Sequence, residues 1–150
     1  MDQKAGHTLN RMHEPEEFAR ELEGYAMIRV TFHHVNVTVV PALEEATKDF
    51  YRNVLGLTEV PKPEESRGRG GAWYQIGNIQ LHLSREQTVN NDGAKRHFCL
   101  SVSDLDQMQR RCEDSGVKIL PDEQPIYGTK RFYVRDPGGN LIEIAQDRNA

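Results

Sequence analysis

Long apolar runs and cysteine-rich segments are both missing from this chain of 150 residues. No stretch approaches the roughly 18 apolar residues that a membrane-spanning helix needs, and the first residues, 1–10, are polar, so we expect neither a membrane anchor nor an export signal. The two cysteines, Cys99 and Cys112, lack the spacing of a metal-binding pair, and we expect no disulfide between them. These features predict a cytoplasmic protein.

A strong charge of one sign is also absent. The formal net charge is −4, which gives no general attraction to nucleic acid or to an anionic membrane. Hydrophobic residues make up 37% and charged residues 28% of the chain, as is ordinary for a globular protein. The length suits one domain with a substantial core, or two small modules fused into one.

An internal repeat organises the chain. The segments 33–39 and 96–102 both alternate apolar and polar residues, which is the pattern of a strand with one buried face. Aligned on His34 and His97, their polar faces read His-Asn-Thr and His-Cys-Ser. A predicted helix follows each strand and ends near a glycine, Gly56 or Gly116. Equivalent landmarks recur at an offset of about 60 residues, which indicates a duplicated unit.

Each half reads as strand, helix and three further strands. The elements expected in the first half are strands at 29–40, 57–60, 72–76 and 79–83, with a helix beginning at Pro41 and a loop at 61–71 that is too rich in proline and glycine for regular structure. Those expected in the second half are strands at 96–102, 117–120, 131–134 and 141–144, with a helix capped by Asp104. Residues 1–28 read as an N-terminal extension with a short helix near Pro15.

The predicted fold class is therefore α+β, with two tandem βαβββ modules at 29–88 and 89–150 that form one compact domain over 29–146. One helix covers only one face of each sheet. We expect the other faces, which are curved and polar, to meet in a half-open, barrel-like cleft with the helices outside.

Four residues project from these polar faces at repeat-related positions. They are His34, His82, His97 and Glu143, two from opening strands and two from closing strands. Pairing of the modules would bring them together, and three imidazoles with one carboxylate suit a divalent transition metal. His33 should point toward the helices and is left out. For any one of these residues taken alone, a solvated strand face is the simpler interpretation.

Two further motifs carry a resemblance to a known family. The stretch Phe50-Tyr51-Arg52-Asn53-Val54-Leu55-Gly56-Leu57, the stretch Asp136-Pro137-Gly138-Gly139-Asn140-Leu141-Ile142-Glu143 and the repeated unit resemble the vicinal oxygen chelate superfamily. That group includes glyoxalase I, extradiol dioxygenases, thiol transferases that confer fosfomycin resistance, and bleomycin-resistance proteins. The resemblance covers about residues 30 to 146 and is specific for the fold, whereas one metal scaffold serves many reactions in the group.

The resemblance implies a metal site. It matches His34, His97 and Glu143 to the family's ligands and places His82 where glyoxalase I carries glutamate. His82 is then a ligand or a base, and His82 with Glu143 are the catalytic candidates. The cofactor is one divalent ion of zinc, nickel, manganese, cobalt or iron(II). The modules pair within one chain or across a homodimer, which is the arrangement we favour.

The expected function is a metal-dependent enzyme of glyoxalase or dioxygenase type that acts on a small oxygen-chelating substrate. A lyase, an isomerase or a thiol transferase is favoured over a ring-cleaving oxygenase. The alternatives are a metal-free protein that sequesters a small molecule, as in bleomycin resistance, and a regulatory module. Neither nucleic acid nor membrane is an expected partner.

Five residues are candidates for substrate binding, namely Arg67, Arg69, Lys130, Arg131 and Tyr133. The two arginines of the glycine-rich loop are placed to close over an anionic substrate, although a solvated loop is the simpler interpretation and the one that we favour. The other three precede the last hairpin, at the expected mouth of the cleft. Of Trp73 and Tyr74, one should lie in the core and the other should face the cleft.

Overall fold

The computed structural model describes residues 28–147. The chain divides into two compact units, Met1–Thr31 and Phe32–Ala150. Of the first unit, only residues 28–31 are described, and they have no regular secondary structure. The helix expected near Pro15 lies outside the described residues. No helix in 28–147 is long and apolar enough to cross a membrane.

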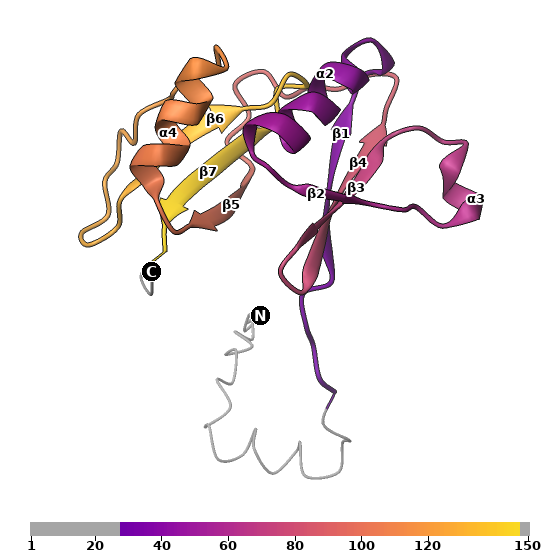
Figure 1. Cartoon of the computed structure of the whole chain (residues 1–150), viewed down its shortest axis with the longest axis horizontal. Helices are drawn as coiled ribbons and strands as arrows, with labels where there is room; N and C mark the ends of the chain where they lie inside the picture. The colour runs from indigo at the N-terminus through magenta and orange to yellow at the C-terminus, as the bar shows by residue number, and fades with distance from the viewer. Residues whose placement is uncertain (1–27, 148–150) are drawn as a thin grey trace, which may run out of the picture. The chain divides into compact units, whose positions relative to one another are not determined.

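The first repeat forms a mixed sheet of four strands. Its order is β1 (His34–Val39), β4 (Ile79–Arg85), β3 (Ala72–Ile76) and β2 (Thr58–Val60), with β1 parallel to β4 and the other pairs antiparallel (Figure 1). The predicted first strand is too long at its start. The strand begins at His34, which is opposite Gln80 of β4, and the His33 carbonyl accepts a 3.3 Å hydrogen bond from the Gln80 backbone N–H.

The second repeat forms a smaller sheet with the same topology. Its order is β5 (His97–Val102), β7 (Leu141–Gln146) and β6 (Arg131–Arg135), with β5 parallel to β7 and β6 antiparallel to it. The strand predicted at 117–120 is wrong. Leu120 makes only an isolated bridge to Tyr133, with two backbone hydrogen bonds of 2.8 Å. Pro121 follows and has no N–H to extend the pairing.

Helices follow each opening strand, as predicted. In the first repeat, Pro41 begins a continuous helical segment of η2 (Pro41–Leu43, a 3-10 turn), α2 (Glu44–Asp49) and η3 (Phe50–Val54, a π-helix). In the second repeat, Asp104 caps α4 (Leu105–Asp114) by accepting a 2.8 Å hydrogen bond from the Gln107 backbone N–H.

The loop at 61–71 is less irregular than its composition suggests. It contains α3 (Glu64–Arg67), which begins directly after Pro63. Glutamates occupy the first turn of this short helix and Arg67 occupies its last, an order that favours a helix because it complements the helix dipole. The prediction of no regular structure at 61–71 is therefore wrong in part.

Both repeats contribute to one core. The fully buried side chains include Tyr51, Tyr74 and Leu81 from the first repeat and Ile142 and Ile144 from the second. Tyr51 lies on η3, and the other four occupy alternate positions of their strands, as the period-2 pattern predicted, which leaves the polar positions on the opposite face.

A buried polar network also joins the repeats. The Tyr51 hydroxyl donates a 2.7 Å hydrogen bond to Asp136, and the Asn140 amide donates to Asp136 at 2.8 Å and to the Thr38 carbonyl at 3.0 Å. Burial raises the pKa of Asp136, whereas the hydrogen bonds from Asn140 and Tyr51 act in the opposite direction. Such a network stabilises the fold only while every partner is present.

Candidate metal centre

The structure places the four predicted metal ligands in two pairs. His34 and His82 stack in the first sheet, with ring centroids 4.3 Å apart and planes 16° apart. His97 and Glu143 meet in the second sheet, where the His97 Nε2 lies 3.0 Å from the Glu143 Oε2. Among residues 28–147, no group of three histidine, cysteine, aspartate or glutamate side chains is close enough to hold a metal ion.

Aromatic stacking holds the first pair. His82 lies between His34 and Trp73, and the Trp73 ring is 3.9 Å from the imidazole and parallel to it within 3°. Trp73 is therefore the member of the Trp73–Tyr74 pair that faces the cleft, and Tyr74 is in the core. The His82 Nε2 is 2.9 Å from the Gln80 side-chain oxygen and donates to it, which leaves Nδ1 as the acceptor. Burial lowers the pKa of His82, and the neighbouring histidines lower it further.

His33 does not lie in the helix layer, contrary to the prediction. It precedes the first paired residue of β1 and is exposed, with its Nδ1 atom 2.8 Å from the His34 Nδ1 atom. This contact leaves the Nε2 atom of His34 free. A hydrogen bond on the second ring nitrogen commonly orients a histidine that binds a metal.

Charged neighbours hold the second pair. Glu143 is only 7% exposed, and its Oε1 accepts a 3.2 Å hydrogen bond from Arg131. Its Oε2 accepts hydrogen bonds from His97 and, at 3.3 Å, from the Tyr133 hydroxyl. Arg131 also donates to Asp122 at 2.8 Å, and the two carboxylates raise the pKa of its guanidinium. These contacts fix the orientation of the Glu143 carboxylate.

The donor chemistry of both pairs fits a divalent metal. Ligands bound at right angles, about 2.1 Å from one ion, are roughly 3 Å apart, which is the spacing between His97 Nε2 and Glu143 Oε2. His34 offers an unbonded Nε2 atom, and His82 offers Nδ1. Cys99 lies opposite Glu143 in the strand register, and burial together with that carboxylate raises the pKa of its thiol to about 11. Cys99 is therefore a neutral neighbour of the pair.

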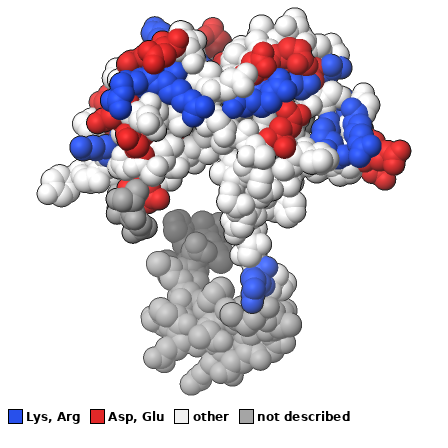
Figure 2. All heavy atoms as spheres, viewed as in Figure 1, with Lys and Arg blue, Asp and Glu red and all other residues white. Residues whose placement is uncertain are grey.

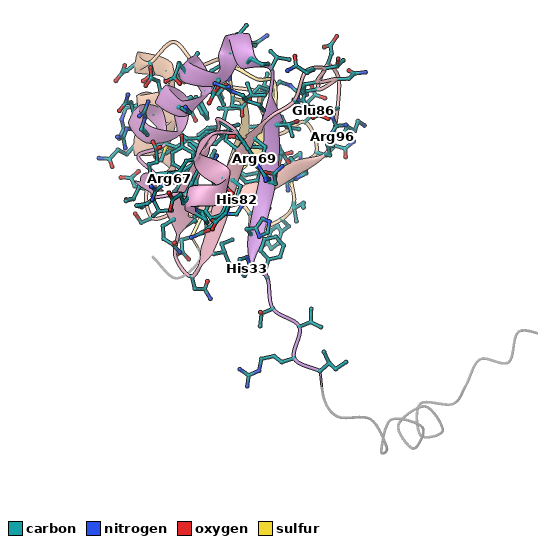
Figure 3. The ribbon with its side chains drawn as sticks, turned by 90° about the vertical axis from the view of Figure 1, so that its right-hand side faces the viewer. His33, Arg67, Arg69, His82, Glu86 and Arg96 are labelled. Carbon is teal, nitrogen blue, oxygen red and sulfur yellow. The ribbon has the colours of Figure 1, made fainter. Side chains whose placement is uncertain are left out.

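The predicted substrate-binding residues fall in different places. Arg131 and Tyr133 lie against Glu143, as described above. Lys130, the next residue along the chain, lines a separate hollow beside the start of α4. Arg69 lines a hollow next to His82, whereas Arg67 donates a 3.1 Å hydrogen bond from its Nε to the Lys62 carbonyl (Figure 3).

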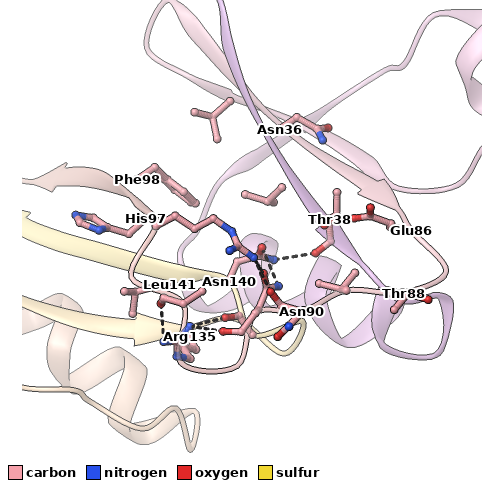
Figure 4. Close-up of a pocket in the computed structure, with 17 residues that line it drawn as sticks. Asn36, Thr38, Glu86, Thr88, Asn90, His97, Phe98, Arg135, Asn140 and Leu141 are labelled. Carbon is pink, nitrogen blue, oxygen red and sulfur yellow. Dashed lines mark hydrogen bonds between the residues drawn. The ribbon is translucent and has the colours of Figure 1, made fainter.

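A cavity of about 510 Å³ lies between the edges of β1 and β5 (Figure 4). His97 lines this cavity, and consecutive residues of β1 from Val35 to Thr38 border it. The other polar residues around it include Asn36, Arg96 and Asn140. Both strand edges at this cavity lack a neighbouring strand in the described sheets.

Sequence reasoning missed several residues of the site. Gln80, Asp122 and Trp73 orient the candidate ligands, and only the alternation of β3 and β4 gave a signal for Gln80 and Trp73. Asp122 lies in an irregular segment and meets Arg131 only through the tertiary fold, so no local pattern indicates it.

The comparisons with known proteins agree with this fold. Residues 31–144 match the family model of the Glyoxalase/Bleomycin resistance protein/Dioxygenase superfamily. This chain belongs to that superfamily.

Particular relatives are similar over different lengths. The chain is 31% identical over 77 residues to the metallothiol transferase FosB of Shouchella clausii (strain KSM-K16), a match that spans only about half of each protein, 50% of this chain and 51% of the relative. A crystal structure of a glyoxalase family protein from Bacillus anthracis is 34% identical, with a TM-score of 0.73, and covers 83% of this chain and 100% of that one. Lactoylglutathione lyase from Agrobacterium tumefaciens shares the fold, with 23% identity, a TM-score of 0.60, and coverage of 79% of this chain and 94% of that one.

Proposed function

We propose that this chain is a divalent-metal-dependent transferase or lyase, in which His34, His97 and Glu143 hold the metal. The observation that carries the proposal is the 3.0 Å approach of His97 to Glu143, at positions that repeat those of His34 and His82. The names of the relatives, a metallothiol transferase and a lactoylglutathione lyase, support these two reaction classes.

Each complete site would be built from two chains. Within residues 28–147 the two ligand pairs lie on different sheets and form no group of three. A homodimer with twofold symmetry would set the His34–His82 pair of one chain against the His97–Glu143 pair of the other, and would do so twice. The unpaired edges of β1 and β5 beside the cavity are suited to such an interface.

The side chains around the site have distinct roles in this proposal. A bound divalent ion would supply Lewis-acid polarisation of substrate oxygens. Arg131 and Tyr133 hold the Glu143 carboxylate in one orientation. His82, with its lowered pKa and its Nε2 engaged by Gln80, is a neutral imidazole at pH 7 that completes the metal site or accepts a proton at Nδ1.

Elemental analysis of protein purified without a tag or added metal tests the metal. We expect close to one zinc, nickel, manganese, cobalt or iron ion per chain, and a loss of that metal in His97→Ala. Two results would instead indicate the metal-free binding protein. The purified protein would lack stoichiometric metal, and a chelator would not change its binding of small molecules.

A mixing experiment tests the shared site. His34→Ala and His97→Ala chains should each fail to hold metal alone. When they are refolded together, a mixed dimer regains one intact site from the two unmodified pairs, so roughly a quarter of the wild-type metal content should return. If light scattering and mass spectrometry detect mixed dimers but the metal content does not recover, the whole site lies within one chain.

A further inference from the structure

A second polar hollow lies on the first repeat, beside His82. It has a volume of about 240 Å³, and three of its lining side chains are basic, whereas none is acidic. Its lining residues are Lys62, Ser66, Arg69, Gly70, Trp73, His82, Ser84 and Arg85. Figure 2 shows lysine and arginine side chains gathered beside α3, the helix that adjoins this hollow.

The positive charge of the hollow is only partly neutralised. Arg85 pairs through its Nε with Glu44, which is 2% exposed and also accepts a 2.9 Å contact from Lys48. The Arg85 side chain remains 47% exposed, so its terminal nitrogens are available to a ligand. Within residues 28–147, the Arg69 side chain makes no hydrogen bond or ion pair, and its guanidinium is free to bind.

Two glycines bring the basic groups together. Gly70 and Gly71 have positive φ angles of 69° and 73°, which other residues rarely adopt. A Cβ at Gly70 would collide with the Arg85 guanidinium, and one at Gly71 would collide with the Leu83 carbonyl. The Lys62 ammonium donates to the Gly70 carbonyl, and the Gly71 N–H donates to Glu44 at 2.6 Å. The loop therefore holds Lys62 and Arg85 at the same hollow.

These groups repel one another in the absence of an anion. Burial lowers the pKa of the Lys62 ammonium, and the neighbouring cations Lys48, Arg69 and Arg85 lower it further, although Glu44 opposes them. A bound anion would relieve this repulsion and would receive charge-assisted hydrogen bonds from several donors.

We propose that this hollow binds an oxyanion group (a carboxylate, sulfate or phosphate) through Arg69, Lys62 and Arg85. The binding itself needs no metal. Its use in catalysis rests on the proposed function, in which a substrate held here by its anionic end extends past Trp73 and His82 toward the metal. The substrate class is thus a small molecule with an oxyanion at one end and a pair of chelating oxygens at the other.

Titration calorimetry on the full chain, with metal removed by chelation, tests the proposal with inorganic phosphate, sulfate and acetate as probes. We expect saturable binding of one anion per chain, tighter for phosphate and sulfate than for acetate, because acetate carries a single charge and only two oxygens. Arg69→Gln should weaken it about tenfold, the effect of losing one hydrogen bond between charged groups. Arg67→Gln is the matched control, because it removes the same charge two residues away and outside the hollow.

Binding that is lost in Arg69→Gln and retained in Arg67→Gln supports the proposal, and the tightest probe assigns the class of oxyanion. No saturable binding of any probe, or an equal loss in the two variants, overturns it. Elemental analysis of the same samples keeps the two proposals separate, since Arg69→Gln should retain the wild-type metal content. If the chain binds the anion but the purified protein contains no metal, only the proposed function is refuted. If the purified protein contains metal but the chain binds no anion, only this inference is refuted.

Discussion

The two repeats place their candidate ligands on equivalent strands but surround them differently. In the first repeat, His34 and His82 are held by an indole ring and a side-chain amide, and no carboxylate among the described residues bonds to either. In the second repeat, His97 meets a carboxylate that also pairs with Arg131. The two repeats thus keep equivalent positions and differ in chemistry, since one face carries two imidazoles and the other carries an imidazole and a carboxylate.

The buried carboxylates of the two repeats show the same contrast. Glu44 in the first repeat is saturated by Lys48, Arg85 and the Gly71 backbone, and it serves to hold a loop. Glu143 in the second repeat is equally well bonded, but one of its partners is a histidine that can exchange its contact for a metal ion. We therefore expect substitution of Glu44 to change stability and substitution of Glu143 to change metal binding.

The largest expected effect is on metal affinity, and it compares the candidate ligands of the two repeats. His97→Ala should weaken metal affinity at least about 100-fold, because it removes a ligand from the pair that carries the carboxylate, whereas His82→Ala should weaken it by only about tenfold. Competition with a coloured chelator measures both affinities. Glu113→Gln, which changes an exposed residue of α4, is the control and should leave affinity unchanged, and equal losses in the first two variants would erase the difference between the repeats.

The second effect concerns Glu44. Burial alone would raise the pKa of Glu44, but hydrogen bonds from Lys48, Gly71 and Arg85 lower it from 4.5 to about 2. A lowered folded-state pKa stabilises the protein at pH values above 4.5, and this stability is lost as pH falls toward 2. Glu44→Gln should therefore lower the free energy of unfolding at pH 7 by at most about 3 kcal/mol, with a smaller difference at pH 3.

Urea denaturation at several pH values measures this effect. The control is Glu45→Gln, which changes an exposed neighbour that also contacts Lys48 and should cost less than about 1 kcal/mol. A Glu44→Gln penalty that does not change with pH would contradict the assignment of the effect to the charge on Glu44.

The third effect concerns the link between the repeats. Tyr51→Phe removes the buried hydrogen bond to Asp136 and should lower the free energy of unfolding by about 1–2 kcal/mol. Tyr74→Phe removes a longer contact of 3.4 Å within the first repeat and should cost less. Hydrogen exchange should show that Tyr51→Phe loosens both sheets. Loosening confined to the first sheet would show that the network does not couple them.

The smallest effect sharpens the comparison of the histidines. Trp73→Leu removes the ring that buries one face of His82, so the pKa of His82 in the metal-free protein should rise from its lowered value. Trp73→Phe keeps a stacked ring and should keep the pKa low. Proton NMR of the imidazole during a pH titration measures the midpoint, and an unchanged midpoint in Trp73→Leu would contradict a role for the stack.

Much of the fold could be predicted because its signals are local. The alternation in β1 and β5, the caps at Pro41 and Asp104 and the offset between repeats each lie within a few residues or recur at a constant spacing. The same alternation placed His34, His82, His97 and Glu143 on the polar faces. What it could not give was the grouping of those four into two pairs, which depends on how one sheet is set against another.

The failures have physical causes that lie outside the local pattern. The segment before His33 alternates like a strand, but the pairing with β4 starts only at His34, opposite Gln80. The segment at 117–120 makes a single bridge at its last residue, and Pro121 has no N–H to continue the pairing beyond it. The Glu44 cluster joins a helix, a glycine loop and the end of β4, three segments that have no pattern in common.

The Tyr51–Asp136–Asn140 network also sets a limit on how the chain can be divided. Asp92 and Gly93 are exposed in the linker between the repeats, so a chain cut there would lose little contact at the point of cleavage. Each fragment, however, would carry half of the shared core and half of the buried network. We therefore expect neither fragment to fold alone, and we expect the two to reassemble when a fused pair of binding domains brings them together, as a split reporter requires.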